Sequence, residues 1–377
     1  MRLSRWRGLP RIPRRIQALA AAAALAAAAL ALGVIAPPAS SGSGGARFAG
    51  GPHLLVSIYA DDESTLWLID PADPSRRQAL FPLAHAPGWA VEGTVSPAGG
   101  RMALLVVPPG ARDPATDTLL LLSDGGPPRV VARGLDLRGG LAWSSDGAEL
   151  FARRTLPDAG GSRRYQLVAF ALGDGDTPPE RTLLQRDDVG GLYPVGRAAD
   201  GPAYAVAVGA GGSALIAIEG DGATSERPLS PGVTREWSLS PGGTRLAYTE
   251  QRGTSLRVML IDLASELRTA QATGSAPASG GSASPVWHPD GTLHAGHFGG
   301  GDGEIHTAGA GGPGAAPGFD LPLGWSPDGA YLALRTFAGT GPGDPGAQSL
   351  AVLGPGGASR ALTDEGLAIL GWWHGAD

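Results

Sequence analysis

The feature that most constrains the fold is a short phrase that recurs along the chain about every 46 residues. Its fullest copy spans 324–329 (GWSPDG) and is followed by the apolar run Tyr331–Leu334. The positions equivalent to the proline of this copy are 97, 145, 199, 241, 289 and 327, with separations of 48, 54, 42, 48 and 38 residues. A repeat of this length, built of short apolar segments, indicates the blades of a β-propeller.

Each copy has the composition of a tight turn between two strands. Proline fixes φ, and the glycine that follows takes the positive φ that such a turn needs. A third apolar segment and, in most units, a shorter fourth one come next, so each repeat predicts one four-stranded antiparallel blade. We expect a structural role for the residues of the phrase, which are Pro97, Asp146, Gly147, Pro241, Asp290, Gly291, Trp325, Pro327, Asp328 and Gly329.

The two ends of the repeat region predict a closed ring. The segment 371–375 (GWWHG) resembles the start of another copy, whereas 53–59, 66–70 and 77–82 supply three strands without a first one. Together they complete one split blade, which leaves the ring no free edge. We therefore expect an all-β chain, a seven-bladed β-propeller of four-stranded blades over 53–377, preceded by one N-terminal hydrophobic helix. Six blades is the alternative, because the copy at 197–201 is weak.

The phrase at Trp325–Ala333 (WSPDGAYLA) resembles the WD40-like (PD40) repeat of TolB-type β-propellers, and the resemblance extends over about 53–377. It implies an extracytoplasmic binding platform. Members of this family include exported accessory proteins and peptidase-associated propellers, so the resemblance is specific for the fold and does not select one activity.

The N-terminus predicts export or membrane anchoring. Residues 1–15 hold six Arg and no acid, 16–36 are uncharged and rich in Ala and Leu, and 37–52 form a Gly/Ser-rich flexible linker. The length of 16–36 favours an uncleaved transmembrane anchor, whereas its alanine content favours a cleaved signal peptide. Because basic flanks stay cytoplasmic, we expect a cell-membrane protein with its propeller on the extracytoplasmic side. The alternative is a secreted or periplasmic protein after signal cleavage.

The composition excludes several chemistries. The chain has no Cys, which excludes thiolate catalysis and Cys-ligated zinc, and no Lys, which excludes Schiff-base and P-loop chemistry. Without the six N-terminal Arg, the remaining 23 Arg face 35 acids, a net charge of −12. Such a body repels phosphate backbones, so we expect no nucleic-acid partner. We also expect no cofactor.

Histidines give the sharpest candidate for chemistry. Four of the seven lie in one repeat, at His288, His294, His297 and His306, and Asp290, Asp302 and Glu304 are near them in the sequence. Residues three apart on a strand point to opposite faces, so His294 and His297 cannot share one metal ion unless the strand bulges. We therefore predict no metal site, and His294, His297 and His306 are the residues to examine for one.

Two charged loops are weaker candidates. The acids of Asp61–Glu63 have the oxygen ligands of a calcium site, and Arg153–Arg154 with Arg163–Arg164 could pair with a carboxylate or phosphate. Solvated surface charge is the simpler explanation of both. Ser326 is a turn residue rather than a nucleophile, because 324–328 lacks the second glycine of a nucleophile elbow.

The predicted innermost strands carry a few charges that would line the central channel. They are Glu92, Arg138, Arg197, Arg235 and Glu236. Innermost strands surround the channel of a propeller, so a small-ligand site is sought there first. The aligned Trp143, Trp287, Trp325 and Trp372 are expected to pack between blades instead, because they repeat at one structural position.

Loop lengths indicate which face of the propeller binds. The loops between second and third strands are long at 108–117, 154–164, 299–303 and 338–347, and so is the connection 273–284. These loops leave the same face, where we expect an interaction surface. No catalytic set is assembled, so we predict a non-enzymatic scaffold that binds a protein or peptide partner. The alternative is a hydrolase or lyase acting on glycans or small esters at the channel mouth.

Overall fold

The computed structural model of the protein describes residues 51–157, 163–173, 178–198, 200–270, 281–298 and 318–374. The chain separates into two units, Met1–Gly45 and Ala46–Asp377, and the boundary falls inside the predicted linker. The basic segment 1–15 and the hydrophobic segment 16–36 lie outside the described residues. In the part of the chain that is described, no helix is long and apolar enough to cross a membrane.

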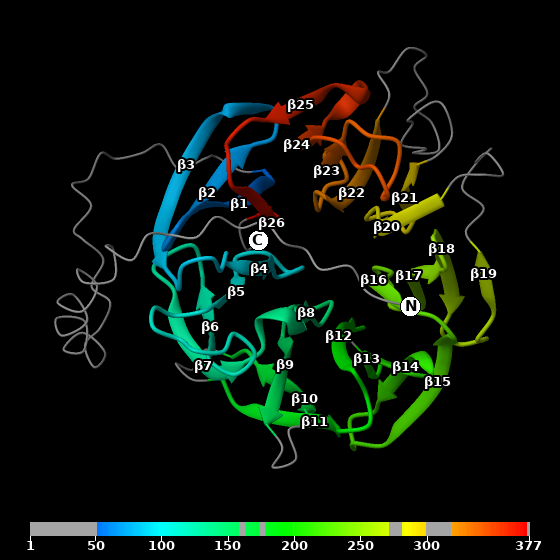
Figure 1. Ribbon diagram of the computed structural model, residues 1–377. Helices are drawn as coiled ribbons and strands as arrows, with labels where there is room; N and C mark the ends of the chain where they lie inside the picture. Colours follow the sequence, from blue (N-terminus) through cyan, green and yellow to red (C-terminus); the bar gives the residue numbers. More distant parts are fainter. Residues whose placement is uncertain are drawn as a thin grey trace, which may run out of the picture. The chain divides into compact units, whose positions relative to one another are not determined.

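The described part of the second unit is built from antiparallel sheets set around a central axis (Figure 1). The sheet that joins the two chain ends contains β26 (Leu367–Trp373), β1 (His53–Ala60), β2 (Glu63–Asp70) and β3 (Asp73–Ala84), in that order. Strand β26 pairs antiparallel with β1, for example Trp372 with Leu54. The predicted closure of the ring by a split blade is therefore confirmed.

Three four-stranded blades follow along the chain. Their strands are β4 (Glu92–Val95), β5 (Met102–Val106), β6 (Thr118–Ser123) and β7 (Arg129–Leu135); β8 (Leu141–Trp143), β9 (Glu149–Pro157), β10 (Arg163–Ala171) and β11 (Glu180–Arg186); and β12 (Gly191–Arg197), β13 (Ala203–Gly209), β14 (Gly212–Ile218) and β15 (Thr224–Ser230). A short 3-10 helix, η1 (Leu137–Gly139), connects the first of these blades to the second.

Two further four-stranded blades complete the described sheets, with a smaller sheet between them in the sequence. The strands are β16 (Thr234–Leu239), β17 (Arg245–Arg252), β18 (Ser255–Asp262) and β19 (Arg268–Ala270); β20 (Gly281–Trp287) and β21 (Leu293–Phe298); and β22 (Phe319–Trp325), β23 (Leu332–Phe337), β24 (Gln348–Leu353) and β25 (Ser359–Leu362), with the 3-10 helix η2 (Pro355–Gly357) before β25.

The all-β propeller with four-stranded blades is confirmed, but the number of blades is not. Six sheets have four strands, and the sheet β20–β21 has two in the described residues. The prediction of seven four-stranded blades is therefore wrong, and the alternative count of six matches the complete blades. The third strand expected at Glu304–Thr307 lies outside the described residues. The weak copy at 197–201, which suggested six blades, nevertheless belongs to the complete blade β12–β15.

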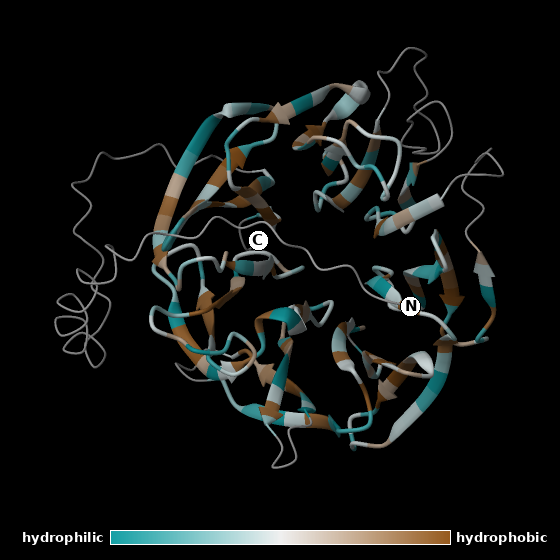
Figure 2. Ribbon diagram, in the orientation of Figure 1, coloured by the Kyte–Doolittle hydropathy of each residue, from teal (hydrophilic) through white to brown (hydrophobic). Residues whose placement is uncertain are grey.

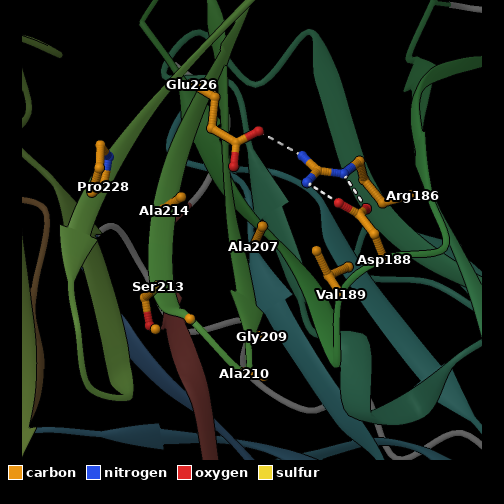
Figure 3. A pocket seen from close by; sticks show the side chains of 12 residues that line it. Arg186, Asp188, Val189, Ala207, Gly209, Ala210, Ser213, Ala214, Glu226 and Pro228 are labelled. Atoms are coloured by element: carbon orange, nitrogen blue, oxygen red, sulfur yellow. Dashed lines mark hydrogen bonds and ion pairs between the residues drawn. The ribbon is translucent and has the colours of Figure 1, made fainter.

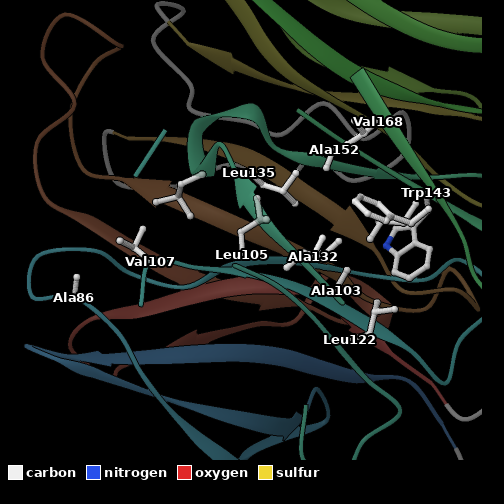
Figure 4. Close-up of a cluster of buried hydrophobic side chains, with 14 residues drawn as sticks. Ala86, Ala103, Leu105, Val107, Leu122, Ala132, Leu135, Trp143, Ala152 and Val168 are labelled. Carbon is white, nitrogen blue, oxygen red and sulfur yellow. The ribbon is translucent and has the colours of Figure 1, made fainter. Parts of the chain in front are cut away.

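Hydrophobic residues concentrate on middle strands such as β5, and polar residues are frequent on outermost strands such as β3 (Figure 2). All five residues of β5 are buried, because each blade is covered on both faces by its neighbours. Figure 4 shows one such inter-blade core, in which Leu105 and Leu122 of one blade meet Trp143 and Val168 of the next. Burial between blades, rather than one central core, therefore stabilises the ring.

The recurring phrase forms the turn from the first to the second strand of a blade. Ser144 Oγ donates to Asp146 Oδ1 at 2.5 Å, and the same bond joins Ser326 and Asp328 at 2.6 Å. Gly147 has φ +68°, and a Cβ built there would lie 2.3 Å from Ser96 Oγ in the preceding blade. Glycine is therefore required both by the turn and by the close approach of two blades.

Candidate functional site

Register places two sets of loops at opposite ends of the blades. Glu92, the first residue of β4, pairs with Leu105 near the end of β5, and Phe319, the first residue of β22, pairs with Phe337 at the end of β23. The long loops after β5 and β23 therefore lie at the end where the innermost strands begin, here called the loop face. The recurring turns, such as Ser144–Gly147, lie at the other end, the turn face.

The described long loops of the loop face are held by their own hydrogen bonds. In the loop 108–117, Asp117 Oδ2 accepts from the backbone N–H groups of Arg112 at 2.8 Å and Asp113 at 3.1 Å, and these bonds lower the pKa of Asp117. In the loop 338–347, the N–H of Ala338 donates to the carbonyl of Ala347 at 2.9 Å. Both loops are thus preformed surfaces rather than loose connections.

Four of the five predicted channel-lining residues lie at the loop face. Glu92 begins β4, Arg138 is in η1, and Arg235 and Glu236 are the second and third residues of β16. We call these four, together with Asp320, the inner rim. Arg197 is the exception, because it ends β12 at the turn face, where its guanidinium pairs with Glu149 at 2.6 Å and donates to the carbonyl of Gly201 at 2.9 Å.

Two carboxylates of the inner rim lack a counter-charge. The carboxylates of Glu92 and Asp320 make no hydrogen bond or ion pair with other groups of the described residues. Burial raises the pKa of Glu92, and the negative charge of Asp136 raises it further. Burial alone raises the pKa of Asp320. Both groups therefore hold a proton more tightly than an ordinary carboxyl, because nothing nearby compensates their charge.

Beside Glu92 lies a buried ion pair that the sequence did not reveal. Asp136 Oδ2 accepts from Arg153 Nη2 at 2.8 Å, from Arg153 Nε at 3.0 Å and from Thr155 Oγ1 at 2.6 Å. The guanidinium of Arg153 lies 5.2 Å from the ring of Tyr165 and 4.7 Å from that of Tyr193. Asp136 and Arg153 are 17 residues apart in the chain. Asp136 lies in the connection before η1 and Arg153 in β9, so the two meet only when this connection folds against β9.

The contacts continue along the inner rim into the next blades. The ring of Tyr193 lies 5.1 Å from that of Trp237, whose Nε1 donates to Thr234 at 2.9 Å. Next to it, Glu236 Oε2 accepts from Thr249 Oγ1 at 2.6 Å and from the N–H of Ser284 at 2.8 Å. A belt of charged and aromatic side chains therefore runs from β4 through β20.

Two residues of this belt have strained backbones. Glu236 has φ +56° and Ser284 has φ +55°, and the register of β16 and of β20 shifts at these points. A positive φ is costly for residues other than glycine and persists only where the surroundings impose it. The bond from Ser284 N–H to Glu236 holds the two bulges together. Arg138 completes the rim, with its guanidinium 5.7 Å from the ring of Trp89.

A hollow of about 570 Å³ lies on the loop face, away from the inner rim (Figure 3). The small residues Ala207 and Ala214 and the hairpin Gly209–Gly212 line it. At one side, Arg186 binds Asp188 through Nε at 2.7 Å and Nη2 at 2.8 Å, and Glu226 through Nη1 at 2.7 Å. Because two acids share one guanidinium, this side of the hollow carries a net negative charge.

The four arginines considered for an anion site are not assembled for one, and Arg153 is buried rather than part of the expected surface charge. Arg153 is buried in its pair with Asp136, and Arg154 pairs with Glu180. Arg163 is exposed at the start of β10, and Arg164 Nε is buried without a hydrogen-bond partner in the described part of the chain. Two of the four guanidiniums therefore already have carboxylate partners.

The described histidines and acids that were candidates for a metal site do not gather at one place. His294 packs its ring 5.1 Å from that of Trp325, and its pKa is lowered by burial and by His288. His294 and His297 are both buried on β21, which runs without a register shift of its own, while His306 lies outside the described residues. Asp61 and Asp62 form the exposed turn between β1 and β2, and Glu63 is the exposed first residue of β2. No group of three or more His, Asp or Glu suited to a metal ion occurs among the described residues.

The structure also contains a serine–histidine pair that the sequence analysis did not identify. Ser64 Oγ lies 2.9 Å from His85 Nε2, and His85 Nδ1 lies 3.1 Å from the carbonyl of Ala86. This is the order of contacts in an activated nucleophile, but Ser64 and His85 are only 0% and 1% exposed. A substrate cannot reach a serine in that position, so the pair stabilises the loop after β3.

Neither the protein-family models nor the curated proteins include a match to this chain. Among solved structures, a chain from a structural and mechanistic study of prolyl endopeptidases matches with a TM-score of 0.53 and 14% identity, over 82% of this chain and 47% of that one. This protein thus spans about half the length of that chain. TolB from Acinetobacter baumannii matches with a TM-score of 0.48 and 12% identity, over 87% of this chain and 67% of TolB. A putative TolB from Agrobacterium tumefaciens matches with a TM-score of 0.45 and 13% identity, over 80% and 89%. The predicted resemblance to TolB-type propellers is confirmed, and at these identities the likeness shows the fold alone.

Proposed function

We propose that the protein is a non-enzymatic scaffold on the extracytoplasmic side of the cell membrane, and that it binds a protein or peptide partner on its loop face. The single observation that carries the proposal is the inner rim, where Glu92 and Asp320 are left without counter-charges beside a rigid aromatic belt. A partner with a basic side chain supplies the missing charge. Aromatic and arginine side chains of this kind are the usual anchors of protein interfaces.

The preformed loops and the hollow beside Arg186 support the same face. The loops 108–117 and 338–347 are already hydrogen-bonded, so binding orders few residues and loses little conformational entropy. The hollow of about 570 Å³ lies within the range of sites that take a small group, and its net negative side again favours a basic side chain.

Capture from the native envelope with the full chain tests the proposal. The loop-face variant is Glu92→Gln with Asp320→Asn, and the matched control is Asp221→Asn in the exposed turn between β14 and β15. We expect one stoichiometric protein that the wild type and the control capture and that the double variant loses by at least about tenfold, or 1.4 kcal/mol. Equal capture by all three proteins contradicts a loop-face partner.

The membrane anchor is tested separately. We propose that residues 16–36 span the membrane and that 1–15 stay in the cytoplasm, as the positive-inside rule requires. Full-length protein should then remain in the membrane fraction after an alkaline wash and keep Met1 as its N-terminus. A soluble product that begins after residue 36 would instead establish signal cleavage and a secreted or periplasmic protein.

One observation favours the alternative, a hydrolase or lyase acting on glycans or small esters. The pKa of Glu92 is raised by burial and by Asp136, which is the direction that a general acid needs, because the carboxyl then keeps its proton to a higher pH than an ordinary one. If the protein is such an enzyme, the wild type should turn over a member of a panel of glycans and esters, and Glu92→Gln should abolish that turnover. The pH–rate profile of the wild type should also show the ionisation of one acidic group. Absence of turnover in the wild type rejects this alternative.

A further inference from the structure

A second hollow, of about 700 Å³, lies on the turn face, opposite the proposed docking surface. Three blades line it. Trp373 comes from the end of β26, Arg101 and Asp124 from turns of the blade β4–β7, and Asp146 from the turn between β8 and β9. Its volume lies within the roughly 300–1,000 Å³ of small-molecule sites.

Trp373 provides a fixed aromatic wall. The indole is half-buried and packs against the core that contains Leu370 and Val95. Gly125, with φ +85°, lies against the edge of the ring, and a Cβ at this position would be 3.2 Å from Cζ2. The ring is therefore held in one orientation before any ligand arrives, which lowers the entropy cost of binding.

The polar groups that line the hollow can form further hydrogen bonds. Arg101 makes two long contacts, from Nε to Asp124 Oδ1 and from Nη1 to the carbonyl of Leu172, both at 3.4 Å. Asp146 Oδ1 accepts from Ser144 and from the N–H of Ala148, and these bonds lower the pKa of Asp146 and keep it ionised. Arg101 Nη2 and Asp146 Oδ2 have no hydrogen bond in the described part of the chain.

The mixture of charges selects the chemical class of the ligand. The two carboxylates of Asp124 and Asp146 outnumber the guanidinium of Arg101, so the hollow repels an anion. A cation is attracted by the carboxylates and repelled by Arg101, so it gains less here than at a site lined by acids alone. A neutral ligand with several hydroxyls both donates to the carboxylates and accepts from the guanidinium. The C–H face of a sugar ring adds apolar contact with the indole of Trp373.

We propose that this turn-face hollow is a binding site for a neutral saccharide, with Trp373 as the stacking platform and Arg101, Asp124 and Asp146 as its hydrogen-bonding groups. The site does not rest on the proposed function, because it shares no residue with the loop face. It gives the propeller a second ligand on the side away from its partner.

Calorimetric titration of the detergent-solubilised full chain tests the proposal. The probes are the neutral trisaccharides maltotriose, cellotriose and chitotriose, with galacturonic acid trimer and glucosamine trimer as the anionic and cationic counterparts. We expect one neutral probe to bind with a Kd of about 1 mM or lower. Trp373→Ala and Arg101→Gln should each weaken binding about tenfold or more. The matched control Arg257→Gln, on the exposed side of β18, should bind as the wild type does.

Three results would overturn the assignment. They are no binding of any neutral probe at about 20 mM, tighter binding of a charged trimer, or an unchanged Kd in Trp373→Ala. Because Trp373 pairs with His53 on β1, its variant is checked by thermal melting. Asp124→Asn, at a side chain that is 74% exposed, removes an acceptor without touching the core and should weaken the same probe.

Discussion

Two ion pairs of the protein are expected to contribute differently to its stability. Asp136 accepts three hydrogen bonds from Arg153 and Thr155, whereas Asp70 pairs with Arg76 at 3.0 Å. The side chains of Asp136 and Arg153 are only 4% and 6% exposed, whereas that of Arg76 is 63% exposed. A buried charge that loses its partner keeps its desolvation cost, whereas an exposed one is solvated again.

Replacement of Arg153 by Met should therefore lower the free energy of unfolding by about 3–5 kcal/mol, measured by urea denaturation, because Asp136 is left buried and unpaired. Arg76→Met, the exposed counterpart, should cost less than about 1 kcal/mol. The second substitution Asp136→Leu in the Arg153→Met background should restore part of the loss. Equal costs for the two single variants would contradict the buried pair.

Glu92 gives a prediction about pH. The folded pKa of Glu92 is raised above the usual value of 4.5, so its contribution to stability is fully present below that value and is lost as pH rises through the folded pKa. Glu92→Gln removes this loss. Because Glu92 is exposed, solvent reduces the effect. We expect the Tm of the variant to exceed that of the wild type at pH 7 by less than about 1 °C, and the difference to vanish near pH 4.

Asp146 supplies a control of the opposite sign. The pKa of Asp146 is lowered by the bonds from Ser144 and Ala148, so its contribution to stability is present above the usual value of 3.8 and is lost as pH falls through the folded pKa. Asp146→Asn should lower the Tm at pH 7 and matter less at acid pH. The same pH trend in both variants would contradict the assigned causes.

The sequence identified some rim residues and missed others for a physical reason. Glu92, Arg138, Arg235 and Glu236 could be predicted because they directly precede or begin a predicted innermost strand. Asp320 was missed because its strand, β22, had not been located at 319–325. The pair of Asp136 and Arg153 was missed because it depends on how the connection after β7 folds against β9, and not on residues that are neighbours in the sequence.

At the scale of elements, the recurring turn joins neighbouring blades as well as neighbouring strands. Trp287 Nε1 donates to the carbonyl of Ser238 at 3.0 Å, and Trp372 Nε1 donates to that of Gly324 at 2.9 Å. Each indole therefore reaches the innermost strand of the preceding blade. Trp143, Trp287 and Trp372 are buried between blades, which is the packing role that their repetition indicates.

Adjacent glycines of one turn provide a matched test of this packing. Gly243 has φ +67°, and a Cβ there would lie 2.1 Å from the Cβ of Ala198, whereas one at Gly242 meets nothing within 4 Å. Gly243→Ala should lower the free energy of unfolding by about 1–3 kcal/mol. Gly242→Ala should change it by less than about 0.5 kcal/mol. Chemical denaturation of both variants measures the difference, and similar values would contradict the close approach.

At the scale of the whole molecule, closure couples the last strand to the first three. Strand β26 pairs with β1 from Leu367 to Trp373, and Trp372 is 7% exposed in a core shared with β24 and β25. The split blade therefore connects the ends of the described chain through both backbone bonds and packing. A ring without a free edge unfolds as one unit more readily than an open array does.

Trp372→Ala should lower the free energy of unfolding by about 3–5 kcal/mol. Trp372→Phe keeps most of the packing and loses the bond to Gly324, so its cost should be nearer about 1 kcal/mol. Hydrogen exchange should show that Trp372→Ala lowers protection in β13 and β14 as well as in β1. Loss confined to the split blade would show that closure does not stabilise the ring as a whole.

The sequence by itself determined the blade architecture, the split closure and the recurring turn, because these depend on local patterns of apolar segments, proline and glycine that repeat along the chain. It did not determine how many blades are complete, because the sheet β20–β21, which has two strands in the described residues, carries the same phrase as the four-stranded sheets. Only the tertiary structure decided that Arg197 lies at the turn face, that Arg153 is buried with Asp136, and that Asp320 joins the inner rim. Those placements depend on register and on contacts between blades, and neither is encoded in the spacing of residues along one strand.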